Sequence, residues 1–185
     1  MTNTHLGSTL DITRSCEDYL STRQGSYEFR CIRYKGVADK LYDMGLDRWD
    51  DIVDIGAGRQ QFESYMRLER KWEGEYIPID GSIDGTNLEE WLPGCRYSFM
   101  VAIEVLEHLN TWERMMMIME NFTICGAVAT VPNPKTVDVL GCDPTHVSVI
   151  HEHDFREHNW SVQPVSFFHK PDDTLLAWHK GIFAG

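Results

Sequence analysis

The run from Ala102 to Leu109 places two carboxylates and an imidazole close together. Glu104, Glu107 and His108 have the spacing i, i+3 and i+4, which on a helix puts all three side chains on one face. Two carboxylates and an imidazole that converge could hold a divalent cation such as magnesium, manganese or zinc. The structural alternative is that the two acids cap or orient neighbouring groups and that His108 is a packed core histidine.

A second candidate site is a glycine turn that follows a short β-branched run. The sequence Val53-Asp54-Ile55-Gly56-Ala57-Gly58 indicates a strand that enters a tight turn, where glycines let the backbone approach a ligand closely. Asp80 lies 22 residues beyond Gly58, and its carboxylate could accept hydrogen bonds from both hydroxyls of a ribose. A plain tight turn without a ligand is the structural alternative.

A glycine turn followed by an acid is shared by proteins that bind nicotinamide dinucleotides and proteins that bind S-adenosylmethionine. The nicotinamide pattern requires Gly-x-Gly-x-x-Gly, and counted from Gly56 its third position is Gln61. That third glycine allows close packing of helix and strand beneath a pyrophosphate. Because S-adenosylmethionine has no phosphate, the absence of the third glycine favours S-adenosylmethionine as the ligand.

Periodicity and turn residues predict the elements that must position these groups. Helical spacing predicts helices over 26–44, 62–72 and 154–158, and apolar runs predict strands over 51–55, 75–80, 97–103, 126–131, 161–168 and 174–180. Asn110 and Glu113 predict a capping box for a further helix that ends near Phe122. The segment 81–94 has room for only a stub of regular structure, and a variable loop follows the strand that ends at 131.

Strands that alternate with helices predict βαβ units and hence a parallel sheet. The last two strands flank a turn, so we expect an antiparallel edge. The prediction is a single α/β domain with a Rossmann-like, mainly parallel sheet over residues 26–185, preceded by an N-terminal tail and lead-in over 1–25. The first helix is expected to pack beside the mouth of the site and to help close it.

Composition narrows the class of protein. The 185 residues carry a formal net charge of −12, which makes a nucleic-acid partner unlikely because phosphate contacts need a basic surface. The five cysteines show no Cys-x-x-Cys spacing, which favours a reducing cytoplasm over a disulfide framework. No apolar run is long enough for a membrane span, and the polar start of the chain is not a signal peptide.

Several segments occur together in an order that identifies a family resemblance. They are Val53–Gly58, Ile79-Asp80, Ala102–Leu109, Thr130-Val131-Pro132-Asn133 and His146-Val147. With them the chain resembles the class I S-adenosylmethionine-dependent methyltransferase superfamily, nearest to the branch around the ubiquinone-biosynthesis O-methyltransferases. The similarity covers about residues 50–155, and its most distinctive part is the run Glu104-Val105-Leu106-Glu107-His108.

The resemblance implies a set of cofactor-binding residues. Asp54, Gly56 and Gly58 would line the methionine end of S-adenosylmethionine, Asp80 would hold the ribose, Asn87 would lie near the adenine amino group, and Ile103 and Glu104 would lie beside the methionine. Ala57, Gly81 and Leu88 complete this set. The chain departs from the family in two places: Gln60 replaces the usual third glycine, and the segment between Asp80 and Asn87 is too short for the usual helix.

The resemblance also implies that the acidic run is part of a metal site. In some relatives, including the methyltransferases that modify the 3′ ends of small RNAs, this run and a later histidine bind a metal, and His146 is the matching later residue. The implied ligands are Glu104, Glu107, His108 and His146. His108 and His146 are also the expected catalytic residues, as bases or through a bound metal that lowers the pKa of an acceptor hydroxyl.

The expected function is methyl transfer from S-adenosylmethionine to a small molecule, at oxygen or nitrogen. One alternative is a non-catalytic or partner-dependent S-adenosylmethionine-binding protein of the same fold. A metal-dependent RNA 2′-O-methyltransferase is another, opposed by the acidic charge. A nicotinamide-dependent oxidoreductase is disfavoured by Gln61.

Overall fold

The centre of the sheet is built from strands whose residues are buried on both faces. β1 (Ile52–Ile55) and β3 (Tyr97–Ile103) consist largely of apolar residues with little exposed surface, as is typical of parallel strands covered on both sides. The computed structural model describes residues 27–167 and 170–181. The predicted tail and lead-in over 1–25 therefore lies outside the described residues.

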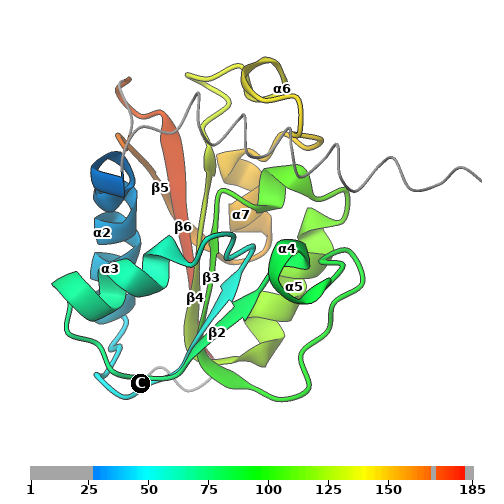
Figure 1. The fold of residues 1–185 in the computed structure, drawn as a ribbon. Helices are drawn as coiled ribbons and strands as arrows, with labels where there is room; N and C mark the ends of the chain where they lie inside the picture. The colour runs from blue at the N-terminus through cyan, green and yellow to red at the C-terminus, as the bar shows by residue number, and fades with distance from the viewer. Residues whose placement is uncertain (1–26, 168–169, 182–185) are drawn as a thin grey trace, which may run out of the picture.

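The described residues form one six-stranded sheet in the order β2-β1-β3-β4-β6-β5 (Figure 1). The other strands are β2 (Tyr76–Ile79), β4 (Thr123–Pro132), β5 (Ser161–Val165) and β6 (Thr174–Lys180). The first four strands of this order run parallel, and β6 runs antiparallel to both β4 and β5. The predicted mainly parallel sheet with antiparallel pairing at one edge is confirmed. Pro78 lies on β2, an edge strand, where its missing N–H leaves the pairing with β1 intact.

Helices cover both faces of the sheet (Figure 1). α2 (Tyr27–Asp43) and α3 (Gln61–Glu69) pack against one face, and α5 (Trp112–Phe122) and α7 (Glu152–Glu157) pack against the other. Alternation along β1 serves both cores, since Val53 and Ile55 join the core under α5 and Ile52 joins the core under α2 and α3. The sheet is thus a rigid platform whose carboxyl edge carries the candidate site.

Three short helices lie in the connections. α4 (Gly81–Asp84) is the predicted stub, whereas α6 (Val139–Cys142) lies in the predicted variable loop. A 3-10 turn, η1 (Leu106–His108), follows β3.

Several element ends differ from the prediction. α3 ends at Glu69 instead of continuing to 72, and Lys71 adopts a left-handed backbone with φ 56°. β4 begins at Thr123, directly after α5, and α7 begins at Glu152. β5 ends at Val165, while position 168 lies outside the described residues.

The predicted capping box of α5 is wrong. Thr111 is the N-cap and makes no side-chain capping bond. Instead Glu89, from the segment between α4 and β3, accepts hydrogen bonds from the Asn110 and Thr111 backbone N–H groups at 2.6 and 3.1 Å. A carboxylate at this position also interacts favourably with the helix dipole. The cap comes from 21 residues earlier, where a local pattern cannot find it.

β1 carries one acid into the core. Asp54 is 3% exposed and accepts a hydrogen bond from the Tyr76 hydroxyl. Burial raises the pKa of Asp54 to about 7, against the opposing effect of the Tyr76 hydrogen bond and with a smaller contribution from the charge of Asp80. The folded protein therefore favours the protonated carboxyl over a pH range in which the unfolded chain is ionised.

We predict that Asp54→Asn removes a pH dependence of stability. Below the ordinary carboxyl pKa of 3.8 the protonated Asp54 contributes its full stability, and this contribution is lost as the pH rises to about 7. The slope for one proton is at most about 1.4 kcal/mol per pH unit. Urea unfolding of both proteins at several pH values in this window should show the wild type losing stability relative to the variant. Parallel curves for the two proteins would contradict the prediction.

Candidate functional site

The glycine turn after β1 is fastened to the end of β2. Gly56 and Gly58 adopt positive φ values of 69° and 49°. A Cβ on Gly56 would lie 2.4 Å from a methyl group of Val105, so this position has no room for a side chain. The Gly58 N–H donates to the Asp80 Oδ2 at 2.9 Å. The structure therefore brings the predicted turn and the predicted acid together at the carboxyl edge of the sheet.

The Asp80 carboxylate is already well satisfied by the protein. Besides Gly58, its Oδ1 accepts hydrogen bonds from the Ser82 backbone N–H at 2.7 Å and the Ser82 hydroxyl at 2.5 Å. A carboxylate offers about four acceptor positions, so about one is left over. Binding both hydroxyls of a ribose requires the Ser82 hydroxyl to rotate away.

The two glutamines that replace expected glycines have different roles. Gln60 precedes α3 with φ 55°, a left-handed conformation that costs a non-glycine residue about 1 kcal/mol. Gln61 accepts hydrogen bonds from Arg30 at 2.6 Å and from the Tyr34 hydroxyl at 3.3 Å. Its side chain thus joins α3 to α2.

The other predicted cofactor-binding residues line the same edge of the sheet. Asn87 is exposed and its Oδ1 accepts the Glu89 N–H at 3.1 Å, while Leu88 is half-buried against the core under α5. Gly81 begins α4 directly after Asp80. Ile103 ends β3, half-buried against the core under α2, and Ala57 lies between the two glycines.

The acidic run after β3 does not form the predicted helix face. Glu104 has φ 56°, and its N–H donates to the Thr130 carbonyl at 3.0 Å and contacts the Thr130 hydroxyl at 3.2 Å. This left-handed residue ends the strand, and only the 3-10 turn over 106–108 follows. The expectation that Glu104, Glu107 and His108 share one helix face is wrong because Glu104 precedes the helical turn.

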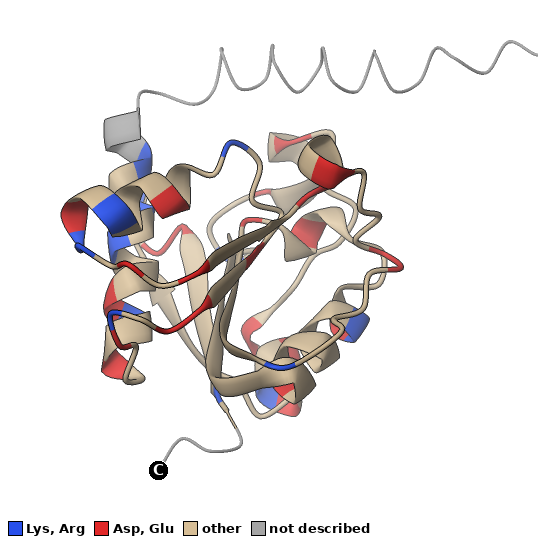
Figure 2. Cartoon of the chain, turned by 60° about the horizontal axis from the view of Figure 1, so that its bottom comes forward, with Lys and Arg blue, Asp and Glu red and all other residues tan. Residues whose placement is uncertain are grey.

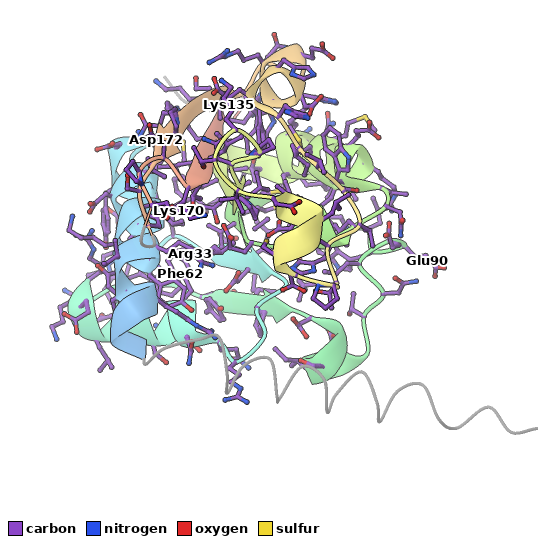
Figure 3. All side chains as sticks on the ribbon, turned by 90° about the horizontal axis from the view of Figure 1, so that it is seen from above. Arg33, Phe62, Glu90, Lys135, Lys170 and Asp172 are labelled. Carbon is purple, nitrogen blue, oxygen red and sulfur yellow. The ribbon has the colours of Figure 1, made fainter. Side chains whose placement is uncertain are left out.

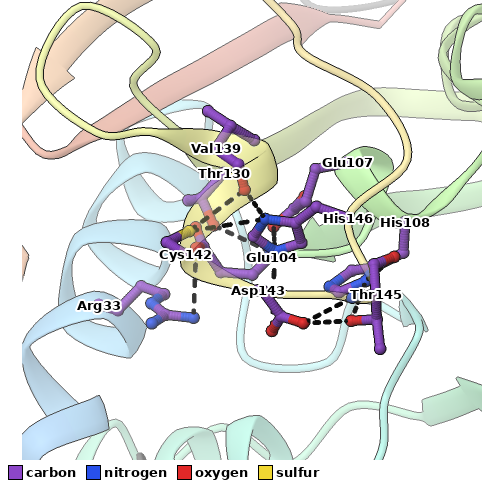
Figure 4. Close-up of polar contacts among 10 residues, drawn as sticks. All are labelled: Arg33, Glu104, Glu107, His108, Thr130, Val139, Cys142, Asp143, Thr145 and His146. Carbon is purple, nitrogen blue, oxygen red and sulfur yellow. Dashed lines mark hydrogen bonds and ion pairs between the residues drawn. The ribbon is translucent and has the colours of Figure 1, made fainter.

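Glu107, His108 and His146 nevertheless converge. Their potential ligand atoms all lie within 4.8 Å of one another (Figure 4). His146 arrives from the loop after α6, because the Val147 and Ser148 N–H groups donate to the Glu107 carbonyl at 2.9 and 3.0 Å. A geometry suited to a metal ion is thus built by a main-chain clamp between distant segments.

The Glu107 carboxyl is completely buried. Neither of its oxygens has a hydrogen-bond partner within the described part of the chain, and the His146 Nε2 lies 3.8 Å from Oε1. Burial, and next the neighbouring Glu104 carboxylate, raise the pKa of Glu107 well above its ordinary value. An ionised Glu107 therefore requires a nearby cation.

Hydrogen bonds to main-chain carbonyls orient both imidazoles. The Nδ1 of His146 lies 2.6 Å from the Val139 carbonyl oxygen, and the Nδ1 of His108 lies 3.1 Å from that of Thr145. A carbonyl can only accept, so this network assigns the proton to Nδ1 and leaves Nε2 with a lone pair. Burial, and next the neighbouring His146, lower the pKa of His108, which favours its neutral form.

The sequence interpretation missed two residues beside this cluster. Arg33 extends from α2 toward Glu104, with its Nη1 4.0 Å from Oε2 (Figures 3 and 4). Asp143 is buried, accepts hydrogen bonds from Thr145, and lies 3.9 Å from the His146 Nε2. Arg33 belongs to a helix predicted only to pack beside the site, so its spacing gave no functional signal. Asp143 belongs to the predicted variable loop.

The distribution of charged residues and the length of the helices are relevant to nucleic-acid and membrane partners. Asp and Glu number 29 against 17 Lys and Arg, and charges of both signs are spread over helices and loops on both sides of the sheet (Figure 2). None of the helices between residues 27 and 181 combines the length and apolarity that crossing a bilayer requires.

Comparison with known proteins gives structural neighbours but no sequence relatives. No protein-family model matches the sequence, and no curated protein matches it. A SAM-dependent methyltransferase from Archaeoglobus fulgidus has 16% identity and a TM-score of 0.66, covering 90% of this chain and 99% of its own.

Two further neighbours were solved with S-adenosylhomocysteine bound. The plantazolicin methyltransferase BpumL has 12% identity and a TM-score of 0.67, covering 94% of this chain and 91% of its own. The magnesium protoporphyrin IX methyltransferase of Synechocystis has 11% identity and a TM-score of 0.57, covering 94% and 95%. The chain therefore has the Rossmann-like fold of S-adenosylmethionine-dependent methyltransferases.

Proposed function

We propose that this protein is an S-adenosylmethionine-dependent methyltransferase that acts on a small molecule, at oxygen or nitrogen. The observation that carries the proposal is the Gly58–Asp80 hydrogen bond. This bond joins a glycine turn to an acid that could bind a ribose, at the carboxyl edge of a methyltransferase fold. The fold of neighbours with bound S-adenosylhomocysteine supports the same cofactor. The narrower assignment to the ubiquinone-biosynthesis branch rests on the run around Glu104 alone.

The proposed cofactor position follows the edge of the sheet. Gly56 to Gly58 and Ile103 to Glu104 would line the methionine end, Asp80 would hold the ribose, and Asn87 would face the adenine. Ala57, Gly81 and Leu88 complete the proposed set of cofactor-binding residues. Asp54 lies on β1 just before the turn, and its carboxyl accepts a hydrogen bond from the Tyr76 hydroxyl. It would therefore contribute to binding of the methionine end indirectly, by positioning the turn.

The cluster beside this position fits a divalent cation. Glu107 offers two buried oxygens without hydrogen-bond partners among the described residues, and His108 and His146 offer their Nε2 lone pairs. Glu104, the fourth ligand that the resemblance implies, is not among the residues whose ligand atoms converge. When bound, such a cation would supply a Lewis acid that lowers the pKa of an acceptor hydroxyl.

Methyl transfer requires little of the protein beyond positioning the sulfonium and the acceptor atom. When bound, S-adenosylmethionine would supply the methyl group from its sulfonium, with the sulfur–carbon bond exchanged for a bond to the acceptor atom and a neutral thioether left behind. An acceptor hydroxyl or ammonium must also lose its proton. When no cation occupies the cluster, the Nε2 of His108 or His146 is the proposed proton acceptor, because the hydrogen bonds of the Nδ1 atoms leave each Nε2 with a lone pair.

One observation favours a second function. The convergence of Glu107, His108 and His146 is also what the resemblance to metal-dependent RNA 2′-O-methyltransferases implies. The net charge of −12 opposes it, because RNA binding needs basic surface. The cytoplasm remains the expected location, based on the cysteine pattern.

We predict that Asp80→Asn weakens binding of S-adenosylmethionine and S-adenosylhomocysteine. The amide keeps an oxygen that can cap α4 but loses the charge, and charge-assisted hydrogen bonds contribute about 1.5–3 kcal/mol, so the loss is about 10- to 100-fold. Isothermal calorimetry measures it. Asp84→Asn, an exposed change on the same short helix, is the control and should bind normally. Binding of NAD alone would overturn the proposed function, and no binding of either sulfur compound would favour a partner-dependent or non-catalytic protein.

We predict that Glu107→Gln and His108→Gln each reduce manganese affinity by at least about 100-fold, because each removes a ligand from a small site. Calorimetric titration with manganese measures the affinity, and far-UV circular dichroism checks the fold. His153→Gln is the matched control, because His153 is exposed and pairs with Asp154. Unchanged manganese affinity in both site variants would exclude the metal site.

A further inference from the structure

The Glu104 carboxylate lies close to the Arg33 guanidinium, which would compete with a bound metal ion for it. Its Oε2 lies 4.0 Å from the Arg33 Nη1, and the two side chains are only 16% and 14% exposed. The carboxylate belongs to the residue after β3 and the guanidinium to α2 (Figure 4), so the pair joins the strand end to the covering helix. An ion pair with so little water around it is screened weakly and restrains both side chains.

The same geometry separates Glu104 from the other three candidate ligands. Only Glu107, His108 and His146 have ligand atoms within 4.8 Å of one another in the described part of the chain. The left-handed backbone at Glu104, fixed by its N–H donation to Thr130, ends β3 before the 3-10 turn that carries Glu107 and His108. Two independent restraints therefore act on Glu104, one on its backbone and one on its carboxylate.

Removing Glu104 from the ligand set changes the chemistry of the site. Four ligands with two carboxylates would offer enough oxygen for magnesium. Two imidazoles and one carboxylate favour manganese, cobalt or zinc, because magnesium prefers oxygen ligands and keeps its waters. A three-ligand site also leaves coordination positions open for water and for an acceptor.

We propose that Arg33 determines the metal class of this site by holding Glu104 away from it. The metal is then bound by Glu107, His108 and His146 alone, and transition-metal ions bind in preference to magnesium. This inference rests on the metal site proposed above. It makes Arg33 a positioning residue that does not itself touch the metal or the acceptor.

Four variants test the inference: Arg33→Gln, Glu104→Gln, the double variant, and Arg33→Lys. The readouts are calorimetric affinities for cobalt, manganese and magnesium, and the visible absorption of bound cobalt, which reports its coordination number. Arg33→Lys keeps the positive charge and guards against a folding defect, which circular dichroism would reveal in any variant.

We expect Glu104→Gln and Arg33→Lys to bind cobalt within about twofold of the wild type, with unchanged spectra. Arg33→Gln should bind magnesium about tenfold more tightly, the scale on which groups around a metal site tune its affinity, and should gain less for cobalt because the added ligand is an oxygen. Its cobalt spectrum should shift as Glu104 joins the site. The double variant should lose both effects.

Three results would overturn the inference while leaving the metal site in place. A loss of about tenfold or more in Glu104→Gln would show that Glu104 is already a ligand. A gain in Arg33→Gln that persists in the double variant would show simple charge repulsion. No change in Arg33→Gln would show that Arg33 does not restrain Glu104. Failure of the metal site itself would appear differently, as cobalt affinity that does not depend on Glu107.

Discussion

The rest of the candidate site depends on the burial of Glu107. Its side chain is fully buried with no hydrogen-bond partner among the described residues, while its main-chain carbonyl accepts two N–H groups from the loop that carries His146. One residue thus supplies both the unsatisfied acid and the anchor that brings an imidazole to it. A buried carboxylate without a cation is costly, so the site exists in one of two forms, with a proton on Glu107 or with a cation beside it.

The glycine turn and the acidic run form one unit. A side chain on Gly56 would collide with Val105, which lies between Glu104 and Glu107, so the turn after β1 packs directly against the run after β3. These strands are neighbours in the parallel sheet. Any movement of the turn is therefore transmitted by packing to the residues beside Glu107, His108 and His146, because close-packed interiors transmit strain.

The sequence predicts the sheet well and the site less completely. Strand positions and the Gly58–Asp80 relation follow from runs of apolar residues and from spacing, which are local signals. The cap of α5 by Glu89 and the pairing of Arg33 with Glu104 are contacts between distant segments, and no periodicity encodes them. The i, i+3, i+4 spacing of the acidic run indicates convergence correctly for Glu107 and His108. It places Glu104 wrongly, since the left-handed residue that ends β3 has no sequence signature when it is not glycine.

The loop that contains α6 orients both histidines. The carbonyl of Val139 accepts from His146, and that of Thr145 accepts from His108. The Thr145 hydroxyl also donates to Asp143 at 2.6 Å, so its oxygen is left to accept the His108 N–H at 3.0 Å. One short segment therefore fixes the protonated nitrogen of each imidazole. Whatever displaces this loop changes the orientation of both histidines at once. The same loop exposes Leu140 and Val147 at its surface, so an apolar molecule that contacts this loop would act on the orientation of both histidines.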